Sequence, residues 1–356
     1  MSSELGLYEA MRNVPITREA AEAILTLKKT PSGLLDLAGA VRDSRLGREL
    51  RLYYPLPRFP SVSVTGDRCS LRCKHCGGYY LRGMTGVETP SKLKRFCTKL
   101  EAEGGVGLLV SGGSDKNGRV PLDRFHDALR WVKENTSLIV NVHTGLLDYG
   151  QANEIASTGI DIASVDIVGS DETIRRVYSL KATKEDYWET LEALRNANVP
   201  HVIPHICVGL DFGEIRGEAA ALEMAQKLDP ELVVLLELMP TQGTAMEAVE
   251  PPSAEDMARV VVAARLMCPE AGIALGCMHP RTGKDRVEKL ALEAGADRIV
   301  LPSRSTVEKA GIAGFSVKHL DGCCAIPKSL EGRALRLGGP QAHLQNVDEV
   351  PGRDAY

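Results

Sequence analysis

The chain has 356 residues, a formal net charge of −4 and 44% hydrophobic residues. A chain of this length and composition can bury a large core, which excludes a protein that is disordered along most of its length. The balanced charge excludes nucleic-acid binding driven by bulk positive charge. No apolar run approaches the roughly 20 residues of a membrane-spanning helix, and the first residues lack the basic-then-apolar pattern of a signal peptide. We therefore expect a cytoplasmic protein without a membrane or nucleic-acid partner.

In chain order, residues 1–50 have the apolar spacing of two or three helices, which we expect to form an N-terminal helical extension packed on the next domain. Eight β-rich runs then alternate with stretches that have helical apolar spacing. These runs cover residues 61–66, 106–112, 137–143, 161–169, 202–209, 232–238, 272–278 and 297–303. Repeated β–α units predict a parallel sheet with right-handed crossovers.

Eight such units in residues 51–325 predict an α/β fold of the (β/α)8 TIM-barrel type, with an open doubly wound sheet as the alternative. Residues 326–356 are rich in glycine and charge, and we expect them to form a C-terminal surface tail. In a barrel, functional side chains gather at the carboxyl ends of the strands. His143, His205 and His279 stand at predicted strand ends, so we expect them to face the cavity, where one would donate a proton or bind a ligand.

Nine cysteines, an odd number, do not indicate a disulfide framework in a reducing compartment. Cys69, Cys73 and Cys76 form the motif C-x3-C-x2-C directly after the first predicted strand of the barrel. A short loop brings three thiolates around one centre, and thiolates select zinc or iron–sulfur clusters. A structural zinc site needs a fourth ligand, for which His75 is available. Three ligands fit a [4Fe–4S] cluster with one iron left open, and both interpretations stand at this point.

With His75 just before its third cysteine and a β/α barrel around it, this motif resembles that of the radical S-adenosylmethionine (SAM) superfamily. The resemblance implies that Cys69, Cys73 and Cys76 hold a [4Fe–4S] cluster, that its open iron binds SAM, and that His75 lies beside the cofactor. It also implies that an electron from the cluster cleaves SAM to a 5′-deoxyadenosyl radical, which abstracts hydrogen from an unactivated C–H bond. A reducing protein of ferredoxin or flavodoxin type would supply the electron.

A glycine pair after the second predicted strand of the barrel extends the resemblance. Superfamily members usually carry a Gly-Gly-Glu-like turn that holds the SAM amino group, and Gly112, Gly113 and Ser114 stand at that place. Glycine permits a close approach of the backbone to a ligand. Ser114 replaces the glutamate, so the resemblance implies the backbone contact to SAM and leaves the side-chain contact without its usual residue.

Roughly residues 15–305 also resemble the biotin synthase and lipoyl synthase branch of the superfamily. This resemblance implies that Asp166, at the end of the fourth predicted strand, accepts hydrogen bonds from the SAM ribose, as an ionised carboxylate can. It also implies a SAM contact at Gly209, around the fifth predicted strand. Lys181 would neutralise the SAM carboxylate.

Two departures separate the chain from the usual form of both enzymes. When this sequence is aligned with biotin synthase, Ile203 and His279 stand at two of the positions whose residues hold the second cluster in that enzyme. The usual ligands of that cluster are therefore not reproduced. Lipoyl synthase has a cysteine motif ahead of the triplet, whereas no cysteine precedes Cys69 here. A second cluster would therefore need other ligands.

The candidate ligands for such an auxiliary iron–sulfur cluster are Cys277 and the vicinal pair Cys323 and Cys324, because thiolate pairs attract soft metals. Cys207 is the next candidate. Each of these is alternatively a small buried hydrophobic residue, as free cysteine often is. Two further cysteines lie in helical patterns and are expected to be core thiols: Cys97 and Cys268.

We predict a transferase that inserts sulfur at an unactivated C–H bond, as in biotin and lipoyl synthesis, with the auxiliary cluster as sulfur source. Its substrate would be a small molecule or an acyl chain, such as octanoyl, attached to a carrier domain, and a second radical SAM enzyme would be a partner. The alternatives are a one-cluster radical rearrangement or metallocofactor-assembly enzyme, a SAM-dependent methyltransferase without radicals, and a non-enzymatic zinc-binding protein.

Overall fold

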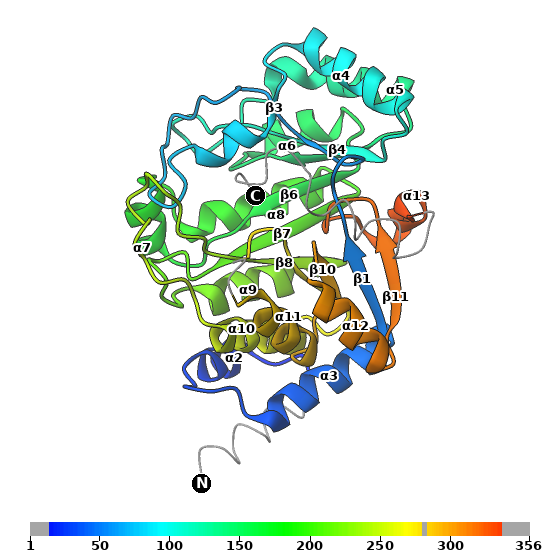
Figure 1. The fold of residues 1–356 in the computed structure, drawn as a ribbon. Coiled ribbons are helices and arrows are strands. Elements are labelled where there is room, and N and C mark those ends of the chain that lie inside the picture. The colour runs from blue at the N-terminus through cyan, green and yellow to red at the C-terminus, as the bar shows by residue number, and fades with distance from the viewer. Residues whose placement is uncertain (1–13, 280–282, 337–356) are drawn as a thin grey trace.

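The computed structural model describes residues 14–279 and 283–336, and its centre is one curled sheet of eleven parallel strands with helices packed around it (Figure 1). The strands are β1 (Glu49–Tyr53), β2 (Ser61–Ser63), β3 (Thr85–Gly86), β4 (Gly107–Ser111), β5 (Ile139–His143), β6 (Ile162–Asp166), β7 (His201–Val208), β8 (Leu232–Glu237), β9 (Gly272–Leu275), β10 (Arg298–Val300) and β11 (Ser316–Leu320). Their order across the sheet is β11-β1-β10-β9-β8-β7-β6-β5-β4-β2-β3.

The predicted α/β class and parallel sheet are confirmed, and the eight predicted strands are present as β2 and β4 to β10. The sequence did not reveal β1, β3 and β11. Charged residues interrupt the apolar pattern of β1 and β11, for example Arg51 and Lys318, and β3 has only two residues. Among the described residues β3 and β11 are the two unpaired edges, so the sheet curls into a partial TIM-type barrel that does not close.

In the part of the chain that the structure describes, most helices lie in the connections between the strands, while two precede the first strand and one follows the last. They are α2 (Arg18–Leu25), α3 (Ser32–Leu46), α4 (Pro90–Ala102), α5 (His126–Asn135), α6 (Tyr149–Ala156), α7 (Asp171–Thr173), α8 (Lys184–Asn196), α9 (Glu218–Leu228), α10 (Ala254–Met267), α11 (Lys284–Glu293), α12 (Arg304–Ile312) and α13 (Glu331–Ala334), with a π-helical turn η3 (Ile174–Tyr178) and the 3-10 turns η1 (Tyr79–Gly83), η2 (Asp123–Phe125) and η4 (Lys328–Leu330). Within residues 14–279 and 283–336, no helix is long and apolar enough to cross a membrane.

The N-terminal helices lie on the outside of the helical layer. Helix α2 contacts α9 and α10, and α3 contacts α10 and α11 (Figure 1). Helix α10 begins with a capping box, in which the Asp256 N–H donates to Ser253 Oγ at 3.2 Å and the Ser253 N–H donates to Asp256 Oδ2 at 2.8 Å. Such caps satisfy the free N–H groups of the first turn and fix where the helix starts.

Buried apolar side chains form one group between sheet and helices and a second group inside the barrel. The inner group includes early residues of the central strands, such as Ile139, Ile162 and Leu232. Cys324 and Ile326, which follow β11, pack into the same inner group and are almost completely buried. The chain after β11 therefore fills the interior of the barrel.

Buried ion pairs anchor this segment after β11. Glu331 lies 2.5 Å from Arg51 of β1 and 3.2 Å from Arg298 of β10, measured between charged atoms. The Asp321 N–H donates to the Ala334 carbonyl at 2.8 Å, which ties the two ends of the segment together. Residues 326–336, which we expected in a surface tail, thus belong to the packed fold, whereas residues 337–356 of that tail lie outside the described residues.

Candidate active site

The loop that carries the first three cysteines leaves the carboxyl end of β2 and turns back on itself. Arg72, Gly77 and Gly78 have positive φ angles of 48°, 53° and 82°. Left-handed backbone reverses the chain direction sharply, and glycine adopts it without strain. The Gly77 N–H donates to the Cys73 carbonyl at 2.7 Å, which closes the turn around the second and third cysteines of the motif.

The turn gathers the metal-binding side chains of the loop. Cys73, His75 and Cys76 each offer a ligand atom, and these atoms lie within 4.8 Å of one another. A hydrogen bond from the Cys73 thiol lowers the pKa of Cys76 to about 4, which favours the thiolate, the form that binds metals. The same bond, together with burial and the nearby Cys76 and Cys69, raises the pKa of Cys73.

Cys69 completes the loop, and its Sγ lies 3.9 Å from the carbonyl oxygen of Ser114. It is not in the tight group of ligand atoms formed by Cys73, His75 and Cys76. Soft thiol donors from one turn, one with a low pKa, fit an iron–sulfur cluster. The closeness of His75 also fits the zinc interpretation.

The predicted glycine turn packs directly against the cysteine loop. A Cβ added to Gly113 would collide with the Arg68 carbonyl oxygen and lie 2.6 Å from the Cys69 Cα. The Ser70 N–H donates to the Ser114 carbonyl at 2.8 Å, which joins the two segments. Only glycine fits at residue 113, because the backbone of the cysteine loop occupies the space of a side chain. Gly112 is less constrained, because a Cβ added there would lie 3.1 Å from the nearest atom, which belongs to the Val64 side chain.

A segment that the sequence analysis did not single out covers the other side of the cysteine loop. The Lys74 N–H donates to the Val177 carbonyl at 2.9 Å, and the His75 ring meets the Tyr178 ring edge-on with centroids 5.4 Å apart. Val177 and Tyr178 belong to the π-helical turn η3, a type of turn that is frequent at functional sites. No residue pattern specifies such a turn, so the sequence did not reveal Tyr178. Lys181 follows this turn and is exposed.

Asp166 lies at the carboxyl end of β6, where it pairs in register with His205 of β7. The rings of His205 and His143 are 5.4 Å apart and nearly perpendicular. Burial, reinforced by His143, lowers the pKa of His205 to about 4, so His205 is neutral near pH 7. The structure thus brings two of the three strand-end histidines together beside Asp166.

The third histidine points elsewhere. His279 Nδ1 lies 2.7 Å from the Gly276 carbonyl oxygen, and its Nε2 lies 3.5 Å from Glu288 Oε1 of α11. The prediction that His279 faces the cavity is wrong, because its ring packs between the end of β9 and helix α11.

Gly209 follows β7 in a tightly packed corner. A Cβ added there would collide with Pro252 Cγ and lie 2.8 Å from its Cδ, and the φ angle of Gly209 is 74°. The Gly209 N–H donates to Glu218 Oε1 at 2.8 Å. The need for glycine at this position therefore comes from packing against Pro252, while a contact of Gly209 to SAM stays a prediction.

The three cysteines predicted to hold an auxiliary cluster come from two strand ends. Cys277 follows β9, and Cys323 and Cys324 follow β11. Burial and the charge of Cys323 raise the pKa of Cys277 to about 12, and a hydrogen bond from Cys324 lowers the pKa of Cys323. The three thiols therefore lie in one electrostatic neighbourhood, although among the described residues they do not form a group as tight as that of Cys73, His75 and Cys76.

Of the remaining cysteines, Cys207 lies on β7, where burial and then the charge of Asp166 raise its pKa. Cys97 and Cys268 are buried at the helices α4 and α10, as predicted for core thiols.

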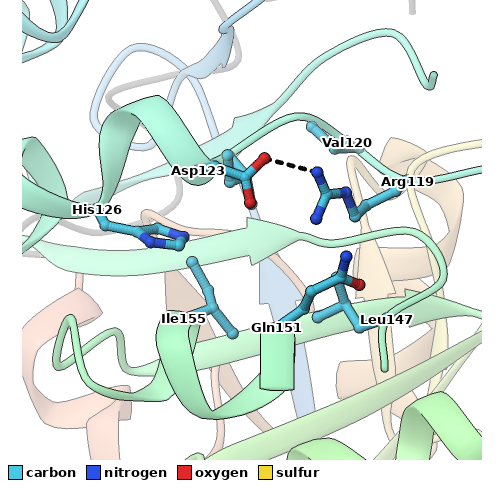
Figure 2. Close-up of a pocket in the computed structure, with 8 residues that line it drawn as sticks. Arg119, Val120, Asp123, His126, Leu147, Gln151 and Ile155 are labelled. Carbon is cyan, nitrogen blue, oxygen red and sulfur yellow. Dashed lines mark hydrogen bonds and ion pairs between the residues drawn. The ribbon is translucent and has the colours of Figure 1, made fainter. Parts of the chain in front are cut away.

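A separate hollow of about 10 Å³ lies between η2, α5 and α6 (Figure 2). Asp123, His126 and Glu154 bring their ligand atoms within 4.8 Å of one another beside it. However, Arg119 Nη2 lies 2.6 Å from Asp123 Oδ2 and neutralises that carboxylate, as the dashed line in Figure 2 shows. The group is not part of the loop that carries the cysteines.

Comparison with known proteins points to one family. Residues 63–216 match the model of the radical SAM superfamily. A biotin synthase from Prochlorococcus marinus is 31% identical over 184 residues, which cover 50% of this chain and 53% of that relative, about half its length. A biotin synthase from Synechococcus sp. is 29% identical over 289 residues, covering 78% of this chain and 83% of the relative. A biotin synthase from Streptomyces coelicolor is 25% identical over 363 residues, covering 94% of this chain and 83% of the relative.

Solved structures share the fold at lower identity. The crystal structure of methylornithine synthase (PylB) superposes with a TM-score of 0.63 at 19% identity, covering 87% of this chain and 96% of that one. HydG, a maturase of the [FeFe]-hydrogenase, superposes with a TM-score of 0.65 at 18% identity, covering 88% of this chain and 74% of the HydG chain. These likenesses concern the fold.

Proposed function

This chain belongs to the radical SAM superfamily and is a radical SAM enzyme, and on that premise we propose that it inserts sulfur at an unactivated C–H bond. The observation that carries the proposal is the presence of two separate sets of thiols at strand ends of one barrel. Cys73 and Cys76 lie on the loop after β2, and Cys277 and Cys323 follow β9 and β11. A radical enzyme that only cleaves SAM needs the first set alone.

The superfamily implies a [4Fe–4S] cluster and SAM. When bound, they would supply a 5′-deoxyadenosyl radical that removes hydrogen from the substrate, and a second cluster would supply the sulfur atom. Cys69, Cys73 and Cys76 would hold the first cluster, and Gly113 would let the turn after β4 approach it closely.

Three further residues would orient SAM. Asp166 would accept hydrogen bonds from the ribose hydroxyls, since an ionised carboxylate is a pure acceptor. Lys181 would compensate the SAM carboxylate. Gly209 would form part of the wall around the nucleoside. The position of Asp166 at a strand end and the exposure of Lys181 support these roles.

Cys277, Cys323 and Cys324 would hold the second cluster. Their mutual influence on thiol pKa supports a shared site, and the buried segment after β11 would hold two of the three ligands rigidly. This barrel would shield the substrate radical from solvent.

The proposed partners follow from this chemistry. The substrate would be a small molecule or an acyl chain on a carrier domain, and the biotin synthases among the relatives support an aliphatic carbon as the target. A ferredoxin- or flavodoxin-type protein would deliver the electron, and a second radical SAM enzyme would share the pathway. We propose a cytoplasmic location, which the need for reduced thiols and a low-potential donor supports.

Iron and sulfide content after anaerobic purification tests the proposal. Two [4Fe–4S] clusters give about eight irons per chain, whereas one gives about four. Replacement of Cys277, Cys323 and Cys324 by alanine should reduce eight irons to about four and leave 5′-deoxyadenosine formation with dithionite intact. Four irons in the unmodified protein would overturn sulfur insertion and favour a one-cluster rearrangement or cofactor-assembly enzyme. A colourless zinc protein, or S-adenosylhomocysteine as the product, would contradict the radical chemistry itself.

A further inference from the structure

Asn141 is a polar residue in the inner wall of the barrel. It lies in the middle of β5 and is 0% exposed. Its Oδ1 accepts a hydrogen bond from Ser164 Oγ of β6 at 2.9 Å. Its Nδ2 forms no well-aligned hydrogen bond within the part of the chain that the structure describes. A buried amide N–H without a partner costs free energy, so this group calls for an acceptor.

Asn141 lies next to the second thiol site. The register partners of Asn141 are Leu109 of β4 and Ile162 of β6. Ile162 belongs to the inner apolar group, and Leu109 and Cys323 both pack against that group. The side chains of Asn141 and Cys323 lie close enough for a hydrogen bond between the amide and the thiol. Cys323 is therefore the sulfur beside the free donor.

The neighbouring hydrogen bonds leave this donor available. Ser164 holds the oxygen end of the amide, which directs the nitrogen end away from β6.

We infer that Asn141 is a positioning residue of the second thiol site, whose amide N–H donates to the sulfur of Cys323 and thereby raises the reduction potential of a cluster held there. This inference rests on the proposed function, because it assumes a cluster on Cys277, Cys323 and Cys324. Hydrogen bonds to ligand sulfur favour the reduced, more negative state of an iron–sulfur cluster. An asparagine provides the donor without adding a charge, whereas an ionised aspartate could only accept.

The experiment isolates the second cluster by replacing Cys69, Cys73 and Cys76 with alanine. In this background the remaining iron, about four per chain, belongs to the second site. Asn141→Leu keeps the approximate shape and removes the donor, and Asn141→Ala removes the side chain. Anaerobic redox titration followed by electron paramagnetic resonance gives the midpoint potential. Asn153→Ala is the matched control, since the Asn153 amide bonds the Tyr149 carbonyl on exposed α6.

We expect both Asn141 variants to retain iron. At a fixed potential, their ratio of reduced to oxidised cluster should be at least tenfold smaller, which corresponds to a midpoint potential lower by about 59 mV for a one-electron couple. The Asn153 variant should match its parent. An unchanged potential in Asn141→Leu with iron retained would overturn this inference and leave the proposed function standing. If the background binds no iron, the second cluster is overturned and the role of Asn141 with it. Should Asn141→Ala fail to fold, Asn141→Leu alone decides.

Discussion

The two thiol sites differ in how the chain assembles them. Cys73 and Cys76 meet because a single turn closes at Gly77, within one loop. Cys277 and Cys323 come into one electrostatic neighbourhood because the segment after β11 enters the barrel and packs inside it. The first site depends on local backbone geometry, so its chemistry can be inferred from spacing. The second site depends on the whole fold, so a substitution that weakens distant packing should release iron from this site first.

The largest expected effect separates the two sites directly. Replacing Cys69, Cys73 and Cys76 by alanine should reduce 5′-deoxyadenosine formation to the level without enzyme and remove about four irons per chain, because the thiolates are the ligands. The irons of the second site should stay. Anaerobic iron analysis and chromatography of the nucleoside products measure both.

Cys97→Ala is the control for this change, since Cys97 is a fully buried thiol of α4 outside both sites. It should keep both the iron and SAM cleavage. Continued SAM cleavage in the triple variant would contradict the assignment of the first site.

The next effect concerns the anchor of the second site. Glu331→Gln removes one of the two buried carboxylates that Arg51 and Arg298 share, the other being Asp297, and we expect the free energy of unfolding to fall by about 2 kcal/mol, the scale for the loss of a charge-assisted hydrogen bond. Urea denaturation measures the loss. Iron should be lost from the second site before the first, because the segment after β11 carries two of its cysteines.

The exposed pair of Glu308 and Arg304 provides the matched change, because it joins the same kinds of side chain on the surface of α12. Glu308→Gln should hardly alter stability. If Glu331→Gln empties both sites equally, the two sites do not differ in their dependence on the fold.

Much of the fold could be predicted because strands β4 to β10 are apolar and evenly spaced. The strands β1 and β11 could not, since Arg51 and Lys318 face neighbours that the sequence does not identify. The cysteine loop could be recognised from its spacing. Tyr178 and Asn141 could not, because their importance arises from a π-helical turn and from a register between strands. Local patterns predict local sites, and contacts between distant segments require the structure.

A smaller effect tests the local geometry of the first site. Gly113→Ala places a Cβ against the Arg68 carbonyl and the Cys69 Cα, so the cysteine loop must move. We expect a loss of about 1–3 kcal/mol in stability, as for other overpacked positions, and weaker iron binding at the first site only. Calorimetry and iron analysis of the two sites measure these changes.

Gly311→Ala is the glycine control, because a Cβ there meets no atom within 4 Å and the residue lies in α12. It should be neutral or slightly stabilising. Equal losses for the two alanine variants would show that the tight contact at Gly113 has no role.

The last effect depends on pH and concerns the rim of the barrel, at the end of β7. Burial raises the pKa of Glu218 to about 7 from its ordinary value of 4.5, and its Oε1 accepts the Gly209 N–H. Between these two values the unfolded chain has released the proton while the folded protein retains it. The Glu218 contribution is therefore fully present below about pH 4.5 and is lost as pH rises toward 7, by about 1.4 kcal/mol per pH unit.

Glu218→Gln removes this titration while keeping an oxygen for Gly209, so its stability relative to the unmodified protein should improve steadily from pH 5 to pH 7 and then level off. Chemical denaturation across that range measures the difference. Glu214→Gln, in an exposed pair with Arg216, should follow the unmodified protein at every pH. Parallel curves for Glu218→Gln and the unmodified protein would mean that Glu218 is ionised in the fold. The corner at Gly209 would then be held by a charged carboxylate, and the rim of the barrel would be no more pH-sensitive than its surface.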